Sequence, residues 1–415
     1  MTTRVFYGWY LVAALGLTTI VSYGISQYLF GVLVVPIEQD LGWSRAAISG
    51  AFSGGLIVAA LLGLPIGALV DRHGGRWPMT AGSLLGGITL LLLSRVTELW
   101  QFYVLWAGCL GLAMALTFYT VSFVVVANWF QRRRGRALAL LTVLGGLSSP
   151  IYIPLAGLLV AQLGWRSAVV VLGATALVIA APVHALVVRR RPGDLGLTPD
   201  GEGDGLEGDG SVPGHRLRHA LTRPPFWTLM LAAALSTAAY SVVLAHVVAY
   251  LIGIGYEPVL AAGILGLTGL VSLPGRFVFN FISDRFGPQP LLALCLVLQA
   301  VSILLLLAAT SGLSVAAFVL VYGSAFGAIS PLRASVLADH FGRLAYGSIT
   351  AVQGLPSGLL AAVAPFLAGL LFDRFGDYLL AWMLTAAAFA LGAVAVWVTP
   401  RAEAPAQLTQ SPEVN

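Results

Sequence analysis

The sequence contains no lysine and has few charged residues of any kind. All 22 basic residues are arginines, and charged residues make up 9% of the 415-residue chain, against about 25% in an average soluble domain. Hydrophobic residues make up 58% of the chain, and its mean hydropathy is +0.91. A water-soluble fold needs a charged surface that this composition does not supply, so the sequence predicts an integral membrane protein.

Cysteines and catalytic motifs are also scarce. Cys109 and Cys295 both lie within apolar runs, which argues against a disulfide framework and favours small buried side chains. The sequence has no H-E-x-x-H motif, no G-x-S-x-G motif and no pair of carboxylates within an apolar run. Because hydrolases and metalloenzymes depend on such groups, we predict a protein that is not an enzyme and uses no cofactor or metal.

The sequence does contain a series of long apolar runs separated by short polar breaks. Each run has at least 19 residues, which is enough for a helix to cross a hydrocarbon core of about 30 Å. The runs predict an all-α membrane protein with twelve transmembrane helices, at approximately 8–35, 45–70, 77–96, 99–127, 136–163, 166–188, 225–252, 259–283, 289–310, 313–337, 346–372 and 378–399.

The arginines set the expected orientation of these helices. With the N-terminus in the cytoplasm, sixteen arginines lie on that side, and Arg45, Arg95, Arg166 and Arg374 lie outside. This asymmetry satisfies the positive-inside rule with both termini cytoplasmic. We therefore attribute the pI of about 9.4 to topology and contact with anionic lipid headgroups, and not to nucleic-acid binding. The expected location is the inner (plasma) membrane, which the chain crosses many times.

The composition changes abruptly after the sixth run. Within residues 189–225, "DGEGDG" (200–205) has the spacing of a calcium loop, but its twelfth position is Ser211 and not glutamate. We interpret this stretch as a flexible acidic linker. The predicted parts of the chain are an N-terminal six-helix half (1–190), a cytoplasmic linker (191–223), a C-terminal six-helix half (224–400) and a cytoplasmic tail (401–415).

The two predicted halves resemble each other in sequence. "GLPIGALVDRHGGR" (63–76) corresponds to "GRFVFNFISDRFG" (275–287), and "ANWFQRRRGRA" (127–137) corresponds to "ADHFGRLAYGS" (338–348). Two parallel six-helix repeats are typical of transporters in which one half rocks against the other around a site at mid-membrane.

The same motifs carry a family resemblance. "GALVDRHGGR" (67–76) resembles the loop motif of the major facilitator superfamily. "FYGWYLV" (6–12), the "WF" before the arginine-rich break at 129–136 and an arginine in the eighth run are similar to the monocarboxylate transporter family and its bacterial relatives, which include oxalate:formate exchangers. The resemblance implies a major facilitator-type fold that transports a small carboxylate through the lipid bilayer, and we expect it to function as a monomer.

Charges at helix ends are candidates for gating. Such charges can clasp the cytoplasmic side in one conformational state and release it in another, and the family resemblance supports that role. Arg333 precedes Asp339 by six residues near the inner end of the tenth run, and we expect these two to form a structural or gating ion pair. The predicted gating residues are Asp71, Arg72, Arg76, Asp284, Arg285 and Arg333.

Arg276 lies inside the eighth run, eight residues before Asp284, or about 12 Å along a helix axis. Every acidic residue falls at a helix end, in a loop, in the linker or in the tail, so none is expected at this depth. An uncompensated charge there costs at least about 2.5–3.5 kcal/mol and is kept mainly where it faces a cavity or ligand. Because guanidinium matches a carboxylate with two parallel hydrogen bonds, a carboxylate substrate is the favoured partner. The alternative is a structural arginine satisfied by helix-end carbonyls and water.

Several other residues are candidates for substrate contact. His246, in the seventh run, is either a hydrogen-bonded structural residue or a group that donates to the substrate or titrates during transport. Tyr119 is favoured in the first half because, in the family it resembles, the fourth span lines the carboxylate site. The remaining candidates, each of which is alternatively a packing residue, are Gln27 and Tyr28 beside Tyr23, Leu144 and Gly145 in the fifth run, and Tyr322, Phe326 and Gln353 around an expected pocket for a short aliphatic tail.

The chain departs from the families that it resembles. Animal monocarboxylate transporters carry a lysine in span one and an aspartate one turn before the span-eight arginine, where this chain has Ser272 and no lysine. Oxalate exchangers carry a span-eleven lysine, which is also missing. One central cation favours a monoanion, so the predicted function is transport of a lactate-like or pyruvate-like monocarboxylate by alternating access with proton symport. The alternatives are a carboxylate anion exchanger of the oxalate:formate type and a non-transporting sensor on a transporter scaffold.

Overall fold

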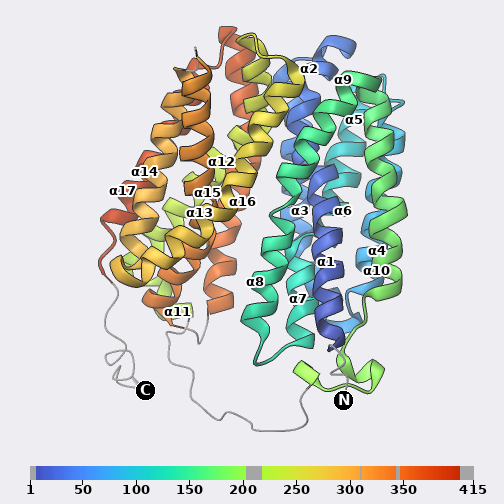
Figure 1. The fold of residues 1–415 in the computed structure, drawn as a ribbon, viewed down its shortest axis with the longest axis vertical. Coiled ribbons are helices and arrows are strands. Elements are labelled where there is room, and N and C mark those ends of the chain that lie inside the picture. Colours follow the sequence, from blue (N-terminus) through green and yellow to red (C-terminus); the bar gives the residue numbers. More distant parts are fainter. Residues whose placement is uncertain (1–5, 202–216, 309–310, 343–345, 402–415) are drawn as a thin grey trace. The chain divides into compact units, whose positions relative to one another are not determined.

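The computed structural model describes residues 6–201, 217–308, 311–342 and 346–401, and their secondary structure is helical (Figure 1). Within them, ten helical runs are long and apolar enough to cross a membrane. This confirms the predicted all-α membrane class. The count of twelve and the orientation of the termini stay predictions, because one of the ten runs, Arg134–Val187, covers the fifth and sixth predicted helices together.

The chain divides into two compact units. Unit 1 comprises residues 1–206, 244–269 and 365–374, and unit 2 comprises residues 207–243, 270–364 and 375–415. Three helices each contribute a part to unit 1 and a part to unit 2, namely α12 (Pro224–Gly253), α13 (Pro258–Phe286) and α16 (Tyr346–Phe375). The predicted division into halves follows the sequence repeat and not these contacts, so it stays a prediction. Most of the predicted linker (202–216) and tail (402–415) lies outside the described residues.

The remaining helices belong to one unit each. Those of unit 1 are α1 (Tyr7–Tyr23), α2 (Leu29–Leu41), α3 (Arg45–His73), α4 (Arg76–Leu93), α5 (Leu99–Tyr103), α6 (Gly111–Thr117), α7 (Tyr119–Trp129), α8 (Arg134–Gly145), α9 (Ser148–Thr175) and α10 (Ala181–Val187), with π-helical turns at Gly24–Tyr28, Val104–Leu110 and Ala176–Ala180 and short 3₁₀ turns at Pro192–Leu195 and Pro199–Gly201. Those of unit 2 are α11 (Leu217–Leu221), α14 (Pro288–Leu307), α15 (Gly312–Phe341) and α17 (Leu379–Trp397).

Small residues allow the helices of each unit to pack closely. In unit 1, α1 runs alongside α8, and α4 packs on α6 and α9 (Figure 1). A Cβ added to Gly173 of α9 would lie 3.0 Å from the carbonyl oxygen of Gly87 of α4, so only glycine permits this approach. In unit 2, α14 packs on both α15 and α17. Since hydrocarbon gives helices no hydrophobic reason to associate, such close packing supplies much of their attraction.

Several helices of unit 1 are interrupted. The first predicted helix contains the π-helical turn Gly24–Tyr28 between α1 and α2, and Phe118 is extended, with ψ 177°, between α6 and α7. Within α9, Gly164 has φ 75° and ψ 158°, which separates the fifth predicted helix from the sixth. Interruptions of this kind in membrane helices are tolerated where neighbouring helices satisfy the released backbone groups, and they are frequent at functional sites.

The repeated loops identified in the sequence share one backbone conformation. Gly74 follows α3 with φ 83° and ψ 163°, and Gly287 follows α13 with φ 82° and ψ 152°. Each glycine N–H donates to the carbonyl four residues earlier, that of Val70 at 2.7 Å and that of Ser283 at 2.9 Å. This region of φ and ψ is essentially restricted to glycine, so the sequence repeat corresponds to a repeated structural requirement.

Gly287→Ala is expected to destabilise the protein by about 1–3 kcal/mol, because the added Cβ strains a backbone that only glycine adopts readily. No neighbour blocks the added methyl, since the nearest atom is the Pro290 Cδ at 3.9 Å. The thermal unfolding midpoint of the detergent-solubilised protein measures the effect. The control is Gly312→Ala at the first position of α15, where nothing lies within 4 Å of an added Cβ and the midpoint should not fall. Equal midpoints for the two variants would refute the strain argument.

Candidate functional site

Arg276 lies where α13 and α15 cross in unit 2. The crossing is made by glycines, since a Cβ on Gly275 would lie 2.6 Å from the Ser324 Cα and one on Gly327 would lie 2.7 Å from the Ser272 carbonyl carbon. The half-buried Arg276 follows directly, and its Nε donates a hydrogen bond to the Gly327 carbonyl oxygen at 3.3 Å. The close crossing therefore holds the guanidinium against the backbone of α15.

A stack of aromatic rings lies on α15 next to this crossing. Phe326 stacks on Tyr240 of α12 with centroids 4.7 Å apart, and its ring is nearly parallel to that of Tyr322 at 6.1 Å. Tyr322 is 1% exposed and also stacks on Phe318. The structure thus brings together three predicted residues, Arg276, Tyr322 and Phe326, and adds Tyr240. Sequence reasoning missed Tyr240, whose only signal was a tyrosine within an apolar run.

Gln353 is engaged with a different part of unit 2. Its side chain is 5% exposed, and Nε2 donates to the carbonyl of Phe226 in the first turn of α12 at 3.1 Å. This bond ties α16 to α12, which is a structural contact. A role for Gln353 in substrate contact stays a prediction.

The predicted residues of the first half gather around the helix interruptions of unit 1. Tyr23 stacks on Phe118 at 3.9 Å, and its ring centroid lies 5.1 Å from that of Tyr119 and 6.4 Å from that of Tyr28. Tyr28 and the half-buried Gln27 both lie on the π-helical turn. The end of α1 and the start of α7 therefore present one polar aromatic cluster from two helices.

The end of α8 closes this cluster. A Cβ on Gly145 would overlap the Tyr119 hydroxyl and lie 2.8 Å from Thr19 Cγ2. The neighbouring Leu144 packs its side chain against Gly16 of α1. Gly145 thus makes room for Tyr119, whereas Leu144 fills space between helices. A role for either residue in substrate contact stays a prediction.

His246 lies in the part of α12 that belongs to unit 1. It is fully buried, with Nε2 2.9 Å from the Pro365 carbonyl oxygen and 3.4 Å from the Ser49 Oγ. A carbonyl only accepts, so Nε2 carries the proton and donates to Pro365. The structure thus shows the hydrogen-bonded arrangement, linking α12, α16 and α3. A direct role in substrate binding stays a prediction.

A second contact in unit 1 joins the same two helices, α3 and α16. The Asp373 carboxylate accepts hydrogen bonds from the backbone N–H of Arg45 at 3.0 Å and of Ala46 at 2.8 Å, the first two N–H groups of α3. Arg45 binds Glu38 at 2.9 Å, and its guanidinium lies 3.7 Å from the ring centroid of Phe372. We call this set of contacts the α3–α16 clasp. It satisfies a helix N-terminus with a carboxylate, which the helix dipole also favours.

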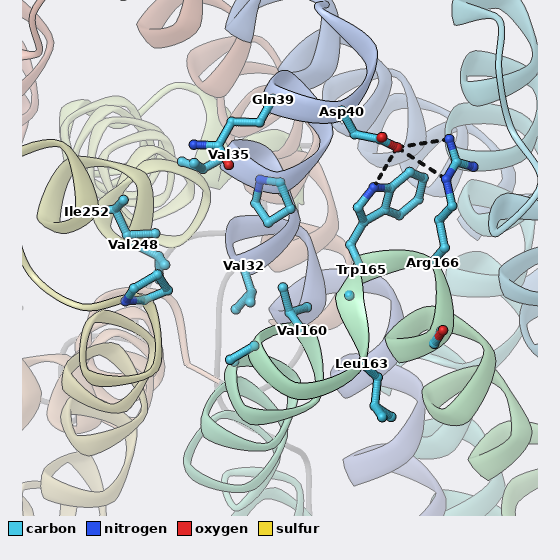
Figure 2. A pocket seen from close by; sticks show the side chains of 16 residues that line it. Val32, Val35, Gln39, Asp40, Val160, Leu163, Trp165, Arg166, Val248 and Ile252 are labelled. Carbon is cyan, nitrogen blue, oxygen red and sulfur yellow. Dashed lines mark hydrogen bonds and ion pairs between the residues drawn. The ribbon is translucent and has the colours of Figure 1, made fainter.

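A cavity of about 710 Å³ also lies in unit 1, lined by α2, α9, α12 and the start of α13 (Figure 2). Its walls are mostly apolar, and Asp40 closes one end by accepting from Trp165 Nε1 at 3.0 Å and pairing with Arg166 at 3.0 Å. Arg166 also donates to the carbonyls of Ser94 and Val96. None of the residues predicted from the sequence lines this cavity. Arg166, the cation in its lining, is already bound to Asp40 and to the carbonyls of Ser94 and Val96.

The predicted gating residues are only partly described. The side chains of Asp71 and Asp284 lie outside the described residues. Arg72 and Arg285 are exposed, and Arg76 Nε donates to the Ala185 carbonyl at 2.6 Å. In the part of the chain that the structure describes, no ion pair joins Arg333 to Asp339. Six residues advance a helix by about 600°, which leaves the two side chains on different faces here. The gating role of Arg333 stays a prediction.

The start of the predicted linker is bound to the loop between α7 and α8. Asp200, 5% exposed, accepts hydrogen bonds from the backbone N–H groups of Gln131 at 2.9 Å, Arg132 at 2.8 Å and Arg133 at 3.2 Å. Burial alone raises the pKa of the Asp200 carboxyl, but the three hydrogen bonds and the Arg133 guanidinium outweigh it, so its pKa lies below the usual value. The linker is therefore folded at Asp200, where the sequence predicted a flexible chain.

The comparisons with known proteins agree with this architecture. The sequence profile of the Major Facilitator Superfamily matches residues 15–352 and 272–414. The chain is 30% identical over 399 residues to monocarboxylate transporter 13 of Bos taurus, covering 95% of this chain and 89% of that protein. It is 26% identical over 411 residues to monocarboxylate transporter 3 of Rattus norvegicus, covering 95% and 80%. In fold it is similar to a bacterial homolog of the human lysosomal transporter Spinster, solved inward-facing and occupied, with a TM-score of 0.70, 16% identity and coverage of 97% and 98%.

Asp200→Asn is expected to lower the free energy of unfolding at pH 7 by about 1–3 kcal/mol, because a neutral amide accepts the N–H bonds less strongly. A carboxylate whose pKa is lowered by folding stabilises above its unfolded pKa of about 3.9, and that stabilisation is lost as pH falls through the lowered pKa. The difference from the parent protein should therefore be constant at neutral pH and should begin to shrink as the pH falls below about 4.

The control for this prediction is Asp194→Asn in the same stretch, where the ion pair with Arg191 is exposed and 3.6 Å long. Such a pair contributes little, so this variant should match the parent protein at every pH. Unfolding curves between pH 3 and pH 8 compare the three proteins. A difference for Asp200→Asn that does not change with pH would show that its charge is not what stabilises the loop.

Proposed function

Because the chain belongs to the major facilitator superfamily, as its loop motifs predicted, we propose that it is a secondary active transporter for a small monocarboxylate such as lactate or pyruvate. In this proposal transport proceeds by alternating access with proton symport. Two of the relatives are named monocarboxylate transporters, at 30% and 26% identity. The substrate class rests on the site itself.

The observation that carries the proposal is the position of Arg276. It is a permanent cation within the apolar run Pro258–Ser283, and its guanidinium is oriented by the Gly327 carbonyl. Guanidinium has five N–H donors in a planar fork, and its Nε–H is the donor that reaches this carbonyl. A carboxylate is the anion whose geometry matches such a fork. A carboxylate bound there would face a cation at a depth where charges are costly.

The aromatic residues beside Arg276 favour a small organic tail. Phe326, Tyr322 and Tyr240 form a stack of rings, and Phe326 immediately precedes Gly327, whose carbonyl holds the arginine. Rings of this kind supply apolar contact with little loss of side-chain entropy. A monoanion with a short carbon chain fits one cation and one aromatic wall better than a dianion, which would call for a second cation.

Alternating access requires a closure that can open. By the predicted topology, the α3–α16 clasp lies on the outer side, since Arg45 and Arg374 were both assigned there. Its hydrogen bonds from Arg45 and Ala46 to Asp373 join a helix of the first half to one of the second half. In the proposed cycle these bonds break when the outer side opens and reform when it closes.

Arg276→Ala is expected to lower kcat/KM for L-lactate uptake by about 10- to 100-fold, since a hydrogen-bonded charge contributes about 1.5–3 kcal/mol. The kcat/KM of Arg276→Lys should lie between those of the parent protein and Arg276→Ala, because lysine keeps the positive charge but lacks the planar fork of N–H donors. The measurement is uptake of labelled L-lactate into proteoliposomes, with and without an inward proton gradient, and with vesicles preloaded with unlabelled carboxylate.

The control for this experiment is Arg95→Ala, which removes an exposed arginine from a loop and should leave uptake unchanged. Unaltered uptake in Arg276→Ala would return this residue to a structural role. Uptake that ignores the proton gradient and needs preloaded carboxylate would replace symport with exchange. No uptake of any short monocarboxylate by the parent protein would overturn the proposed substrate class.

Asp373→Ala is expected to favour the outward-open state, because it removes the acceptor of two helix N–H groups in the clasp. The reporter is Ser49→Cys, since Ser49 is fully buried beside His246 in this structure, in a chain whose Cys109 and Cys295 are replaced by serine. Labelling by a membrane-impermeant maleimide should be faster with Asp373→Ala than without it. Asp377→Ala is the control, because Asp377 accepts from the N–H of Leu379, the first residue of α17, two positions along the chain. Equal rates for Asp373→Ala and Asp377→Ala would exclude a gating role for the clasp.

A further inference from the structure

Pro331 lies inside α15, and its position determines what Gly327 can do. In an α-helix the N–H of residue 331 would donate to the carbonyl of residue 327. Proline has no N–H, and its ring displaces the carbonyl four residues earlier. The Gly327 carbonyl therefore lacks its usual helical donor in a segment where hydrocarbon offers none.

Arg276 donates to that same carbonyl. Its Nε is 3.3 Å from the Gly327 oxygen, and the bond crosses from α13 to α15. The close approach of the two backbones at Gly275 and Gly327 brings the arginine within reach. A proline leaves the carbonyl four residues earlier without a donor and turns it away from the helix axis. The Gly327 carbonyl can therefore accept a hydrogen bond from the neighbouring helix.

A similar arrangement occurs in α16 at the Ala361 carbonyl. Pro365 of α16 leaves the Ala361 carbonyl without its helical donor by the same rule. Ser241 Oγ of α12 donates to the Ala361 oxygen at 2.7 Å. A polar side chain from a neighbouring helix thus donates to a proline-released carbonyl in two places, so the contact at Gly327 has a structural parallel within the same chain.

We infer that Pro331 is a positioning residue: it releases the Gly327 carbonyl that holds the Arg276 guanidinium in the orientation needed for the substrate carboxylate. This inference rests on the proposed function for its consequence in transport. It does not rest on it for the bond itself. The side chain of Pro331 does not contact the substrate; it affects binding indirectly, by orienting Arg276.

Pro331→Ala restores an N–H that draws the Gly327 carbonyl back along the helix axis and away from Arg276. The expected result is a KM for L-lactate raised about five- to tenfold, the loss of one net hydrogen bond, with kcat nearly unchanged. A double-mutant cycle with Arg276→Lys tests the route, because lysine has no Nε–H fork. Pro331→Ala should raise KM in the parent protein and have no further effect in Arg276→Lys.

The thermal unfolding midpoints of the same four proteins are also measured in detergent without substrate. Coupling between residues 276 and 331 is expected there too, since the bond exists without cargo. The control is Pro356→Ala, which also adds an N–H inside a helix of unit 2, α16, and which should be additive with Arg276→Lys in both readouts.

The outcomes separate the inference from the proposed function. Additive stability effects of Pro331→Ala and Arg276→Lys would overturn the inference whatever the protein transports. Coupled stability with an unchanged KM would also overturn it, since the bond would then serve packing alone. If the parent protein carries no carboxylate, the proposed function fails before any variant is compared, and the positioning role falls with it even if the stability coupling remains.

Discussion

A backbone carbonyl that loses its helical donor within hydrocarbon must find another one, because water is absent there. This constraint explains two contacts between neighbouring helices. Prolines within α15 and α16 release the carbonyls of Gly327 and Ala361, and side chains from the neighbouring helices, Arg276 and Ser241, donate to them. The bonds link helices that hydrophobicity alone would not hold together, since lipid tails are as apolar as leucine. The released carbonyl, the contact between helices and the orientation of Arg276 thus have a common cause.

The same requirement acts at helix ends, where the first N–H groups have no helical acceptor. Asp373 meets it for α3, and Asp200 meets it for the loop before α8. Both carboxylates come from distant parts of the chain. Hydrogen bonds from backbone N–H groups to a carboxylate are strong because the acceptor is charged. When these bonds break at the membrane surface, water can solvate both the carboxylate and the N–H groups. Such a bond suits a closure that is made and broken repeatedly at a membrane surface, whereas a buried ion pair in hydrocarbon would resist opening.

Local features of the sequence predicted local features of the structure. An arginine within an apolar run, the apolar runs themselves and the glycines that end both copies of the repeated loop are visible one segment at a time, and so is the glycine that admits Tyr119. What could not be predicted depends on residues far apart in sequence. Asp373 binds N–H groups 328 and 327 positions away, and Asp200 binds a loop nearly 70 positions earlier. Neither carboxylate has a local signal, and the choice of Pro365 and Ser49 as partners of His246 likewise arises from packing.

The two interpretations of Arg276 offered by the sequence, structural residue or substrate ligand, are compatible once the contact at Gly327 is considered. An arginine on a flexible stem would lose side-chain entropy on binding each substrate molecule. A guanidinium already anchored through Nε has lost that freedom during folding, so the cost does not recur with each transport cycle. Lysine offers no equivalent, because its ammonium cannot anchor one donor and present a planar pair with the others. A chain that contains 22 arginines and no lysine therefore has, at this position, the cation whose geometry allows both roles at once.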